Sequence, residues 1–195
     1  ITDSLVGSEM CIRDRMDSTG NEVSGNTSGP IRAGWIIHYP VHRARPDARC
    51  VIHVHAPYIT AMSIRNDMVF EPRSSQQAAR FHDDIVYYDV YDGVLNDESE
   101  GERMAEVLGT KRVLMLRNHG ALIATDSVAK AYLDLYQLER ACMYQLLASA
   151  GGGSMALIPE DVTAEMGELA RAGQNLAHFD GMRRWVDEIQ PDYAN

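Results

Sequence analysis

The chain has 195 residues, of which 45% are hydrophobic and 24% are charged, and this composition suits one globular domain with a proper core. Its formal net charge of −10 and its pI near 5.1 disfavour nucleic acid and anionic lipid, so we expect neither a nucleic-acid nor a membrane partner. The three cysteines are widely spaced, which predicts free thiols. No apolar run approaches the roughly 20 residues of a membrane helix, and residues 1–15 show no signal-peptide pattern, so we predict a cytoplasmic protein.

The first 30 residues differ from the rest of the chain. "ITDSLVGSEMCIRDR" has no clear period and resembles the spurious tail sometimes found at the edge of a fragmentary reading frame, whereas "MDSTGNEVSGNTSGP" is rich in turn-forming residues. We therefore expect an irregular, partly non-native segment over residues 1–30, in which Met16 is closer to native sequence. The remainder, residues 31–195, is predicted to form a single domain.

The first clear element is a helix. In "GWIIHYPVHRARPDA", Trp35, His38 and His42 recur at helical spacing, so we predict a helix that contains Pro40 and stops at the following Pro–Asp pair. The next segments predict strands and helices in alternation, namely a strand over 49–56, a helix over 57–65, a strand over 84–90 and a charged helix over 97–109.

The second half of the chain continues this alternation. "RVLMLRNHGALIAT" predicts two strands around a turn at Asn118, His119 and Gly120. A long helix is predicted over 126–153, with Asp126 as its N-cap, a glycine run at its end, and a stripe at helical spacing that contains Val128, Leu135, Leu138, Cys142 and Leu146. A final helical stretch is predicted over 161–189. Alternating strands and helices indicate the α/β class.

Three histidines form the candidate functional site. In "VIHVHAPY", His53 and His55 are two residues apart, and alternate residues of a strand point to the same face. Two such imidazoles can converge on one ion at about 2.0–2.1 Å each, and His119 in the turn is the candidate third ligand. Three neutral histidines with an open fourth position are typical of a catalytic metal site. The alternative is that they are ordinary hydrogen-bonded core or loop residues.

Two stretches that contain these histidines resemble the class II aldolase/adducin family. They are "RARPDARCVIHVHAPYITAMS" and, about sixty residues later, "VLMLRNHGALIATDSVAKAYLDLYQLERAC". The resemblance implies a three-layer α/β/α fold around a central, largely antiparallel sheet, and a symmetric homotetramer with active sites at subunit interfaces. It also implies that His53, His55 and His119 bind a divalent metal, commonly zinc, with Fe, Mn or Co as other possibilities.

The sequence departs from the family pattern at the site of general acid–base catalysis. Family aldolases carry a catalytic Glu four residues before the histidine that matches His38, but this chain has Gly34 there, and Arg32-Ala33 replaces a serine pair that helps to hold a substrate phosphate. The "AGW-x-x-H" form resembles an adducin-like enzyme branch. The family's N-terminal segment, with its phosphate-binding loops, is also missing, so we expect an N-terminally truncated chain.

The sequence leaves open which residues take over proton transfer and substrate binding. Residues i and i+4 share a helix face, so His38 is the candidate proton carrier in place of an acid at Gly34. Alternatively, His38 only hydrogen-bonds the helix to the sheet, or forms a metal pair with His42. Arg32 is a candidate for binding a substrate carboxylate or phosphate, or is simply solvated. Tyr193 resembles the late tyrosine that family members send into a neighbouring subunit's site, and a surface tyrosine is the alternative.

The resemblance implies a metal-dependent lyase of the aldolase type. Such an enzyme would cleave or form a C–C bond in a small hydroxy-carbonyl substrate, phosphorylated or carboxylated in some cases, through a metal-stabilised enediolate. One alternative is a metal-dependent decarboxylase or an Fe(II) oxygenase on the same scaffold, because a histidine site can hold either Zn or Fe(II). The others are a non-catalytic adducin-like interaction module, which retention of all three histidines disfavours, and an inactive fragment of an active parent.

Overall fold

The computed structural model describes residues 17–19, 21, 23, 32–67, 69–91, 93, 97–173 and 176–194. The irregular segment predicted over residues 1–30 therefore lies almost wholly outside the described residues. In chain order the elements are α2 (Arg32–Ala44), β1 (Cys50–Val54), α3 (Pro57–Ser63), η1 (Pro72–Ser74), α4 (Gln76–Ala79), β2 (Ile85–Tyr88), α5 (Glu98–Leu108), β3 (Val113–Leu116), β4 (Gly120–Thr125), α6 (Val128–Ala150), α7 (Glu160–Ala172), α8 (Ala177–Ile189) and η2 (Pro191–Ala194).

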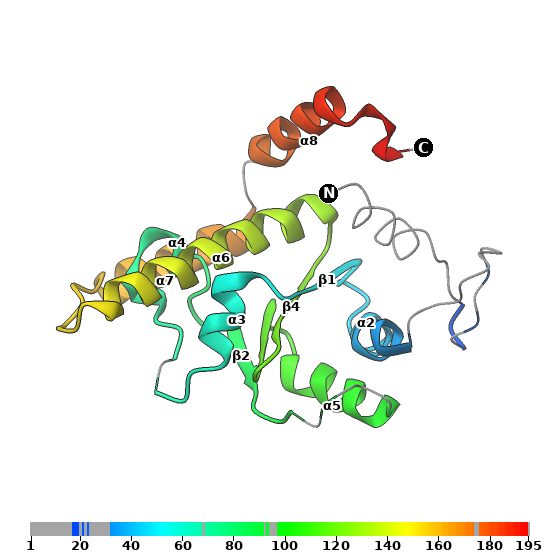
Figure 1. Cartoon of the computed structure of the whole chain (residues 1–195), viewed down its shortest axis with the longest axis horizontal. Coiled ribbons are helices and arrows are strands. Elements are labelled where there is room, and N and C mark those ends of the chain that lie inside the picture. The colour runs from blue at the N-terminus through cyan, green and yellow to red at the C-terminus, as the bar shows by residue number, and fades with distance from the viewer. Residues whose placement is uncertain are drawn as a thin grey trace.

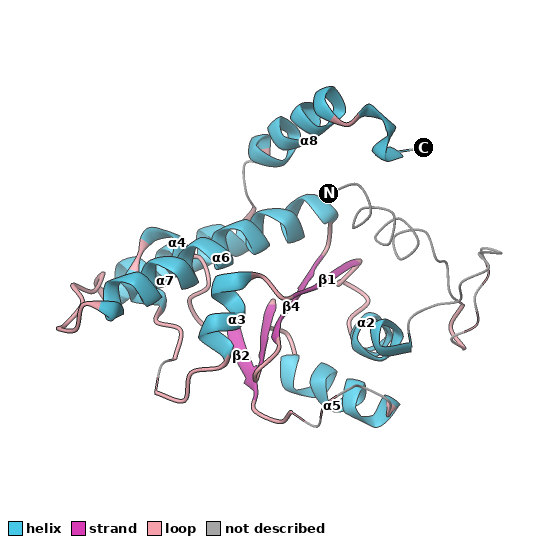
Figure 2. Ribbon diagram, viewed as in Figure 1, coloured by secondary structure: helices cyan, strands magenta, loops and turns pink. Residues whose placement is uncertain are grey.

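Within the described residues, four strands form one sheet in the order β1-β4-β3-β2, which Figure 2 shows at the centre of the domain. Strand β4 pairs antiparallel with both β1 and β3, whereas β2 pairs parallel with β3. Leu116 at the end of β3 pairs with Gly120 at the start of β4, so a tight turn joins these two strands. In that turn Asn118 has a φ of 54°, a conformation that asparagine tolerates better than most residues. The sheet is largely antiparallel, as the sequence predicted.

Helices cover both faces of the sheet (Figure 1). Side chains of β4 alternate between two buried clusters, as expected for a strand with both faces covered. Leu122 and Ala124 pack with α2 and α5, whereas Ala121 and Ile123 pack with α3 and α6. This arrangement confirms the predicted α/β class and the three-layer α/β/α architecture.

The long helix α6 is confirmed, but its predicted start is wrong. Ser127 is the residue before the helix, and Asp126 forms an ion pair with Lys130 and does not cap the first turn. Val128, which the helical spacing grouped with the apolar stripe, is 61% exposed, because burial along α6 begins only at Ala131.

The helical stretch predicted over 161–189 is confirmed, and the structure divides it into two helices. Helix α7 ends at Ala172 and is followed by Gly173, whose φ of 149° breaks the helical path. Helix α8 then begins at Ala177, has no buried residue, and lies beyond α6 away from the sheet (Figure 1). No helix in the described part of the chain has both the length and the apolar character to cross a lipid bilayer.

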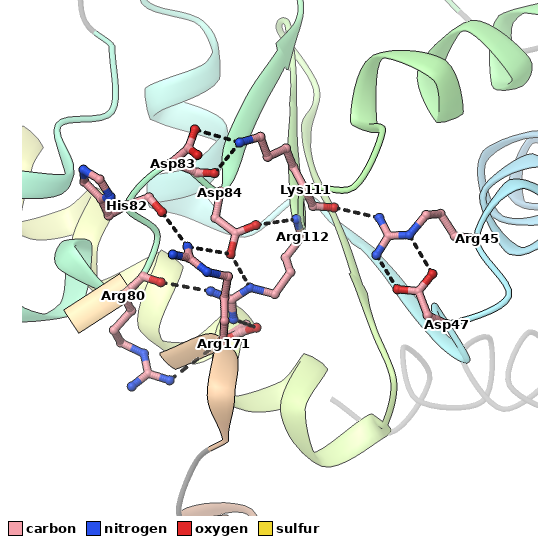
Figure 3. A network of polar contacts seen from close by, with 10 residues as sticks. Arg45, Asp47, Arg80, His82, Asp83, Asp84, Lys111, Arg112 and Arg171 are labelled. Atoms are coloured by element: carbon pink, nitrogen blue, oxygen red, sulfur yellow. Dashed lines mark hydrogen bonds and ion pairs between the residues drawn. The ribbon is translucent and has the colours of Figure 1, made fainter. Parts of the chain in front are cut away.

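A buried ionic cluster joins β2, β3 and α6 (Figure 3). Arg112, immediately before β3, lies 2.6 Å from a carboxylate oxygen of Asp84 and 2.7 Å from one of Asp134. The two carboxylates are only 4% and 1% exposed. Because Asp84 precedes β2 and Asp134 lies on α6, one guanidinium group links three elements at one end of the sheet.

Candidate metal centre

Two segments that are distant in the sequence meet at the other end of the sheet. Strand β1 carries His53, and His55 follows directly after the strand ends at Val54. His119 lies in the turn between β3 and β4. The antiparallel pairing of Val54 with Ala121 sets the end of β1 beside the start of β4, so His119 lies alongside the two strand histidines.

Gly120 permits the close approach of these segments. A Cβ atom at this position would lie 2.2 Å from the carbonyl oxygen of Val54 and 3.3 Å from Cα of His55. Any side chain would therefore push the turn that carries His119 away from β1. The φ of 154° at Gly120 is also one that glycine adopts more readily than other residues.

The rings of His53, His55 and His119 form a compact cluster. One potential ligand nitrogen from each ring lies within 4.8 Å of the other two. The ring centroids are 4.6–4.8 Å apart, and the Nε2 atoms of His53 and His55 are separated by 3.0 Å. The structure thus brings together the three residues that the sequence proposed as ligands.

Hydrogen bonding and burial prepare His53 to act as a ligand. Its Nδ1 lies 3.1 Å from the carbonyl oxygen of Ala121. Because a carbonyl oxygen only accepts, Nδ1 carries the proton and the lone pair of Nε2 points into the cluster. Burial, followed by the charges of His119 and His55, lowers the pKa of His53 to about 4. Burial and His55 also lower the pKa of His119, so both rings are neutral at pH 7, as metal ligands must be.

The donor set fits a divalent ion. Two nitrogens that bind one zinc ion at about 2.0–2.1 Å lie roughly 2.9–3.4 Å apart, and the 3.0 Å between Nε2 of His53 and Nε2 of His55 falls in this range. Two lone pairs facing each other at such a distance repel unless a proton or a cation lies between them. His55 is exposed, so a further coordination position would open toward solvent, as in catalytic sites.

His38 lies on α2, which covers the face of the sheet toward which His53 points. Its ring hydrogen-bonds the backbone of Val51 in β1, and burial together with nearby His42 lowers the pKa of His38. This hydrogen bond ties α2 to the sheet, as the alternative interpretation predicted. Nδ1 of His42 lies 2.7 Å from the carbonyl oxygen of Ala48. Among the described residues, His38 and His42 do not belong to a group of side chains that could hold a metal ion.

Of the other predicted site residues, Arg32 lies away from the cluster. Arg32 is 3.5 Å from Glu98 in an ion pair whose two side chains are largely exposed, so its guanidinium lies at the surface between α2 and α5. Gly34 is one turn before His38, and a Cβ atom there would meet nothing within 4 Å, so the position has room for an acidic side chain. Tyr193 lies in η2, and its side chain is outside the described part of the chain.

Two residues near the cluster were not predicted. The ring of Tyr91, which is 53% exposed, has its centroid 6.3 Å from that of His119. The carboxylate of Glu139 on α6 accepts hydrogen bonds from backbone N–H groups at the start of α3, just after His55, although the partners are 80 or more residues apart in the sequence. Tyr91 lies in no recognisable motif and Glu139 acts only through tertiary contact, so neither has a local sequence signal.

Sequence comparison places the chain among known relatives. The family model of the class II aldolase and adducin N-terminal domain matches residues 8–146. An adducin-related protein of Schizosaccharomyces pombe is 32% identical over 92% of this chain and 58% of its own length. A class 2 aldolase-type protein of Caulobacter vibrioides is 32% identical over 93% of this chain and 71% of its own. The 4-hydroxy-3-prenylphenylpyruvate oxygenase/4-hydroxy-3-prenylbenzoate synthase of Streptomyces roseochromogenus is 32% identical over 83% and 55%.

Solved structures are similar to this chain over about the same share of its length as these relatives. An aldolase II superfamily protein from Pseudomonas syringae has a TM-score of 0.83 and 34% identity, covering 92% of this chain and 73% of its own. An L-fuculose 1-phosphate aldolase from Glaciozyma antarctica has a TM-score of 0.73 and 26% identity, covering 91% and 68%. The chain thus spans between about half and three quarters of the length of these five proteins.

Proposed function

This chain belongs to the class II aldolase and adducin family, and on that premise we propose that it is a divalent-metal-dependent lyase of the aldolase type. Its substrate would be a small hydroxy-carbonyl compound, phosphorylated or carboxylated in some cases, in which a C–C bond is cleaved or formed. The observation that carries this proposal is the convergence of His53, His55 and His119, with ligand nitrogens within 4.8 Å of one another. The similarity to an L-fuculose 1-phosphate aldolase supports the same class of reaction.

The three histidines would hold the metal, with zinc as the first expectation and Fe, Mn or Co as alternatives. A bound divalent ion supplies Lewis-acid polarisation of a substrate oxygen, which contributes several kcal/mol of transition-state stabilisation. The carbonyl of Ala121 holds His53 in the tautomer that binds metal. The exposed side of His55 leaves room for a substrate to approach the centre.

His38 is the proposed proton carrier. Burial lowers its pKa, so the ring is neutral at pH 7, and its hydrogen bond to the backbone of Val51 occupies one nitrogen as a donor. The other nitrogen keeps a lone pair and accepts a proton from substrate. General acid–base help of this kind is worth roughly 10²–10⁴-fold. Substrate binding by Tyr193 and a homotetrameric state are further predictions from the family resemblance. Substrate binding by Arg32 and a cytoplasmic location are predictions from the sequence itself.

A second candidate function is that of a metal-dependent decarboxylase or an Fe(II) oxygenase, with a keto acid as the substrate. The relative from Streptomyces roseochromogenus, named as an oxygenase of a phenylpyruvate, favours this alternative on the same scaffold. The absence of an acid at Gly34 is compatible with it, because that chemistry does not require the aldolase proton shuttle. The adducin-related relative from Schizosaccharomyces pombe supports a third candidate, a non-catalytic interaction module.

Metal analysis and product assays separate these candidates. We expect about one divalent ion per purified chain and its loss in a His53→Ala/His55→Ala variant. A content below a few tenths of an ion that does not change in the variant would contradict both metal enzymes and favour the module. Release of an aldehyde or pyruvate from hydroxy-carbonyl substrates supports the lyase, whereas oxygen uptake with a keto acid supports the oxygenase. A native mass of one chain would contradict the tetramer.

A further inference from the structure

Helix α3 contacts both segments that carry the candidate ligands. It begins at Pro57, two residues after His55, so its first turn fixes the path of the chain leaving that ligand. At its other end, the backbone N–H of Asn118 donates a hydrogen bond of 3.3 Å to the carbonyl of Ser63. Asn118 is the residue before His119, so this seven-residue helix connects the two halves of the cluster.

The first turn of α3 is held by a side chain from another helix. The N–H groups of a helix's first turn lack partners within the helix, and Ala56 offers no side-chain cap. The carboxylate of Glu139 on α6 accepts a hydrogen bond from the backbone N–H of Tyr58 at 3.0 Å and another from that of Ile59 at 2.9 Å. Hydrogen bonds to an ionised acceptor are about twice as strong as those between neutral groups.

The helix that bears Glu139 is well anchored. Its neighbours on α6, Leu138 and Cys142, are fully buried against the sheet, so the carboxylate projects from a part of α6 that is fixed by packing. Both carboxylate oxygens are used, one for each N–H group, and this arrangement fixes the direction of the first turn of α3 as well as its position.

We propose that Glu139 is a positioning residue of the metal centre, and this inference rests on the proposed function in that His53, His55 and His119 bind a divalent ion. Glu139 touches no ligand atom. It holds the start of α3, which sets the chain direction at His55, and through the contact of Ser63 with Asn118 it also restrains the turn that carries His119. Loss of its carboxylate would let the two ligand segments move independently, which weakens metal binding without removing a ligand.

The test compares Glu139→Gln with a matched control, Glu102→Gln. Glutamine keeps one acceptor oxygen but turns an NH₂ group toward the second N–H, so one hydrogen bond is replaced by a repulsive contact. Glu102 pairs with Arg43 on the exposed surface of α5, so the control removes the same charge away from the histidines. Titration with Co²⁺ gives both the affinity and the visible spectrum of the bound ion, and thermal unfolding of the metal-free proteins gives their stability.

We expect Glu139→Gln to bind Co²⁺ about 10–100-fold more weakly than wild type, with an altered spectrum, as for other residues that orient metal ligands. Glu102→Gln is expected to match wild type in both. If Glu139→Gln binds with wild-type affinity and spectrum, including when only its melting temperature falls, the inference is overturned and the metal site stands. If wild-type protein binds no Co²⁺, the inference and the proposed function are both overturned.

A second measurement applies if Glu139→Gln does not fold. In wild-type protein, Co²⁺ binding is expected to slow hydrogen exchange at the amides of Tyr58 and Ile59, because ordering the ligands also favours the contact with Glu139. The amide of Thr163 on α7, which bonds to Pro159, serves as the control and is expected to be unaffected. Unchanged exchange at Tyr58 and Ile59 on metal binding would overturn the inference.

Discussion

Replacing Gly120 with alanine tests whether the close approach of the two ligand segments sets the geometry of the histidine cluster. The added Cβ atom would lie 2.2 Å from the carbonyl oxygen of Val54. Because non-bonded atoms are in favourable contact near about 3.5 Å, the start of β4 and the end of β1 must separate by at least about 1 Å. The imidazole of His119 moves with β4, whereas those of His53 and His55 stay with β1.

The expected loss follows from the tolerance of metal sites. Metal–ligand distances must lie within about 0.2 Å of their usual values, so a displacement of about 1 Å removes one of three protein ligands from effective range. We expect Gly120→Ala to weaken zinc binding by at least about tenfold, as loss of ligand orientation does. Overpacking a filled site costs about 1–3 kcal/mol, so the free energy of unfolding should fall by a similar amount.

The assay is zinc affinity by competition with a chromophoric chelator, together with urea unfolding of the metal-free protein. Gly101→Ala is the matched control, because its Cβ atom would lie 2.1 Å from the carbonyl oxygen of Ile36, a comparable overlap between α5 and α2. We expect the control to lose stability but to keep its zinc affinity. Equal zinc affinity in Gly120→Ala and wild type would refute the reasoning.

Three further predictions concern other parts of the chain. Gly34→Glu should raise the melting temperature, because glycine costs up to about 1 kcal/mol in a helix and the position is open, and it should raise kcat for an aldol substrate; a higher melting temperature with unchanged kcat would contradict a carboxylate role there. Arg112→Ala should lower the free energy of unfolding in urea by about 3–5 kcal/mol, because the buried carboxylates of Asp84 and Asp134 lose their closest guanidinium and keep those of Arg171 and Arg80 only at 3.8 Å each. A loss below about 1 kcal/mol, the usual value of an exposed pair, would show that Arg112 is not essential to the cluster. The pKa of His53 is about 4 in the folded metal-free protein and near its ordinary 6.5 when the chain is unfolded. Its contribution to stability is therefore complete above pH 6.5 and is lost as the pH falls to 4, by up to about 3 kcal/mol. In urea unfolding, the stability of His53→Gln should depend less on pH over this window than that of wild type, and an equal pH dependence would count against the burial of a neutral ring.

The three candidate ligands were each marked in the sequence by a local signal. The two-residue period of a strand places His53 and His55 together, and the glycine after His119 marks the turn between two apolar strands. What sequence periodicity does not supply is the antiparallel pairing of β1 with β4, which brings His119 to the other two rings. The resemblance to the family motifs supplies that long-range information.

The parts of the fold that were missed depend on tertiary contact or on a single backbone angle. The break between α7 and α8 arises at Gly173, whose φ of 149° is not helical. The capping role assigned to Asp126 was wrong because the helix begins at Val128, which makes Ser127 the residue at the N-cap position. Glu139 is one of several charged residues on α6, and only the folded structure places its carboxylate at the start of α3.

The histidines and the Arg112 cluster lie at opposite ends of β3, a four-residue strand that spans roughly 13 Å at about 3.3 Å per residue. This separation has a practical value for protein engineering. A mutant library that randomises positions around the imidazoles would leave untouched the charges of Asp84, Arg112 and Asp134 that fasten α6 to the sheet. New substrate preferences can therefore be selected at the histidine end of the sheet, while the ionic cluster at the other end continues to stabilise the fold.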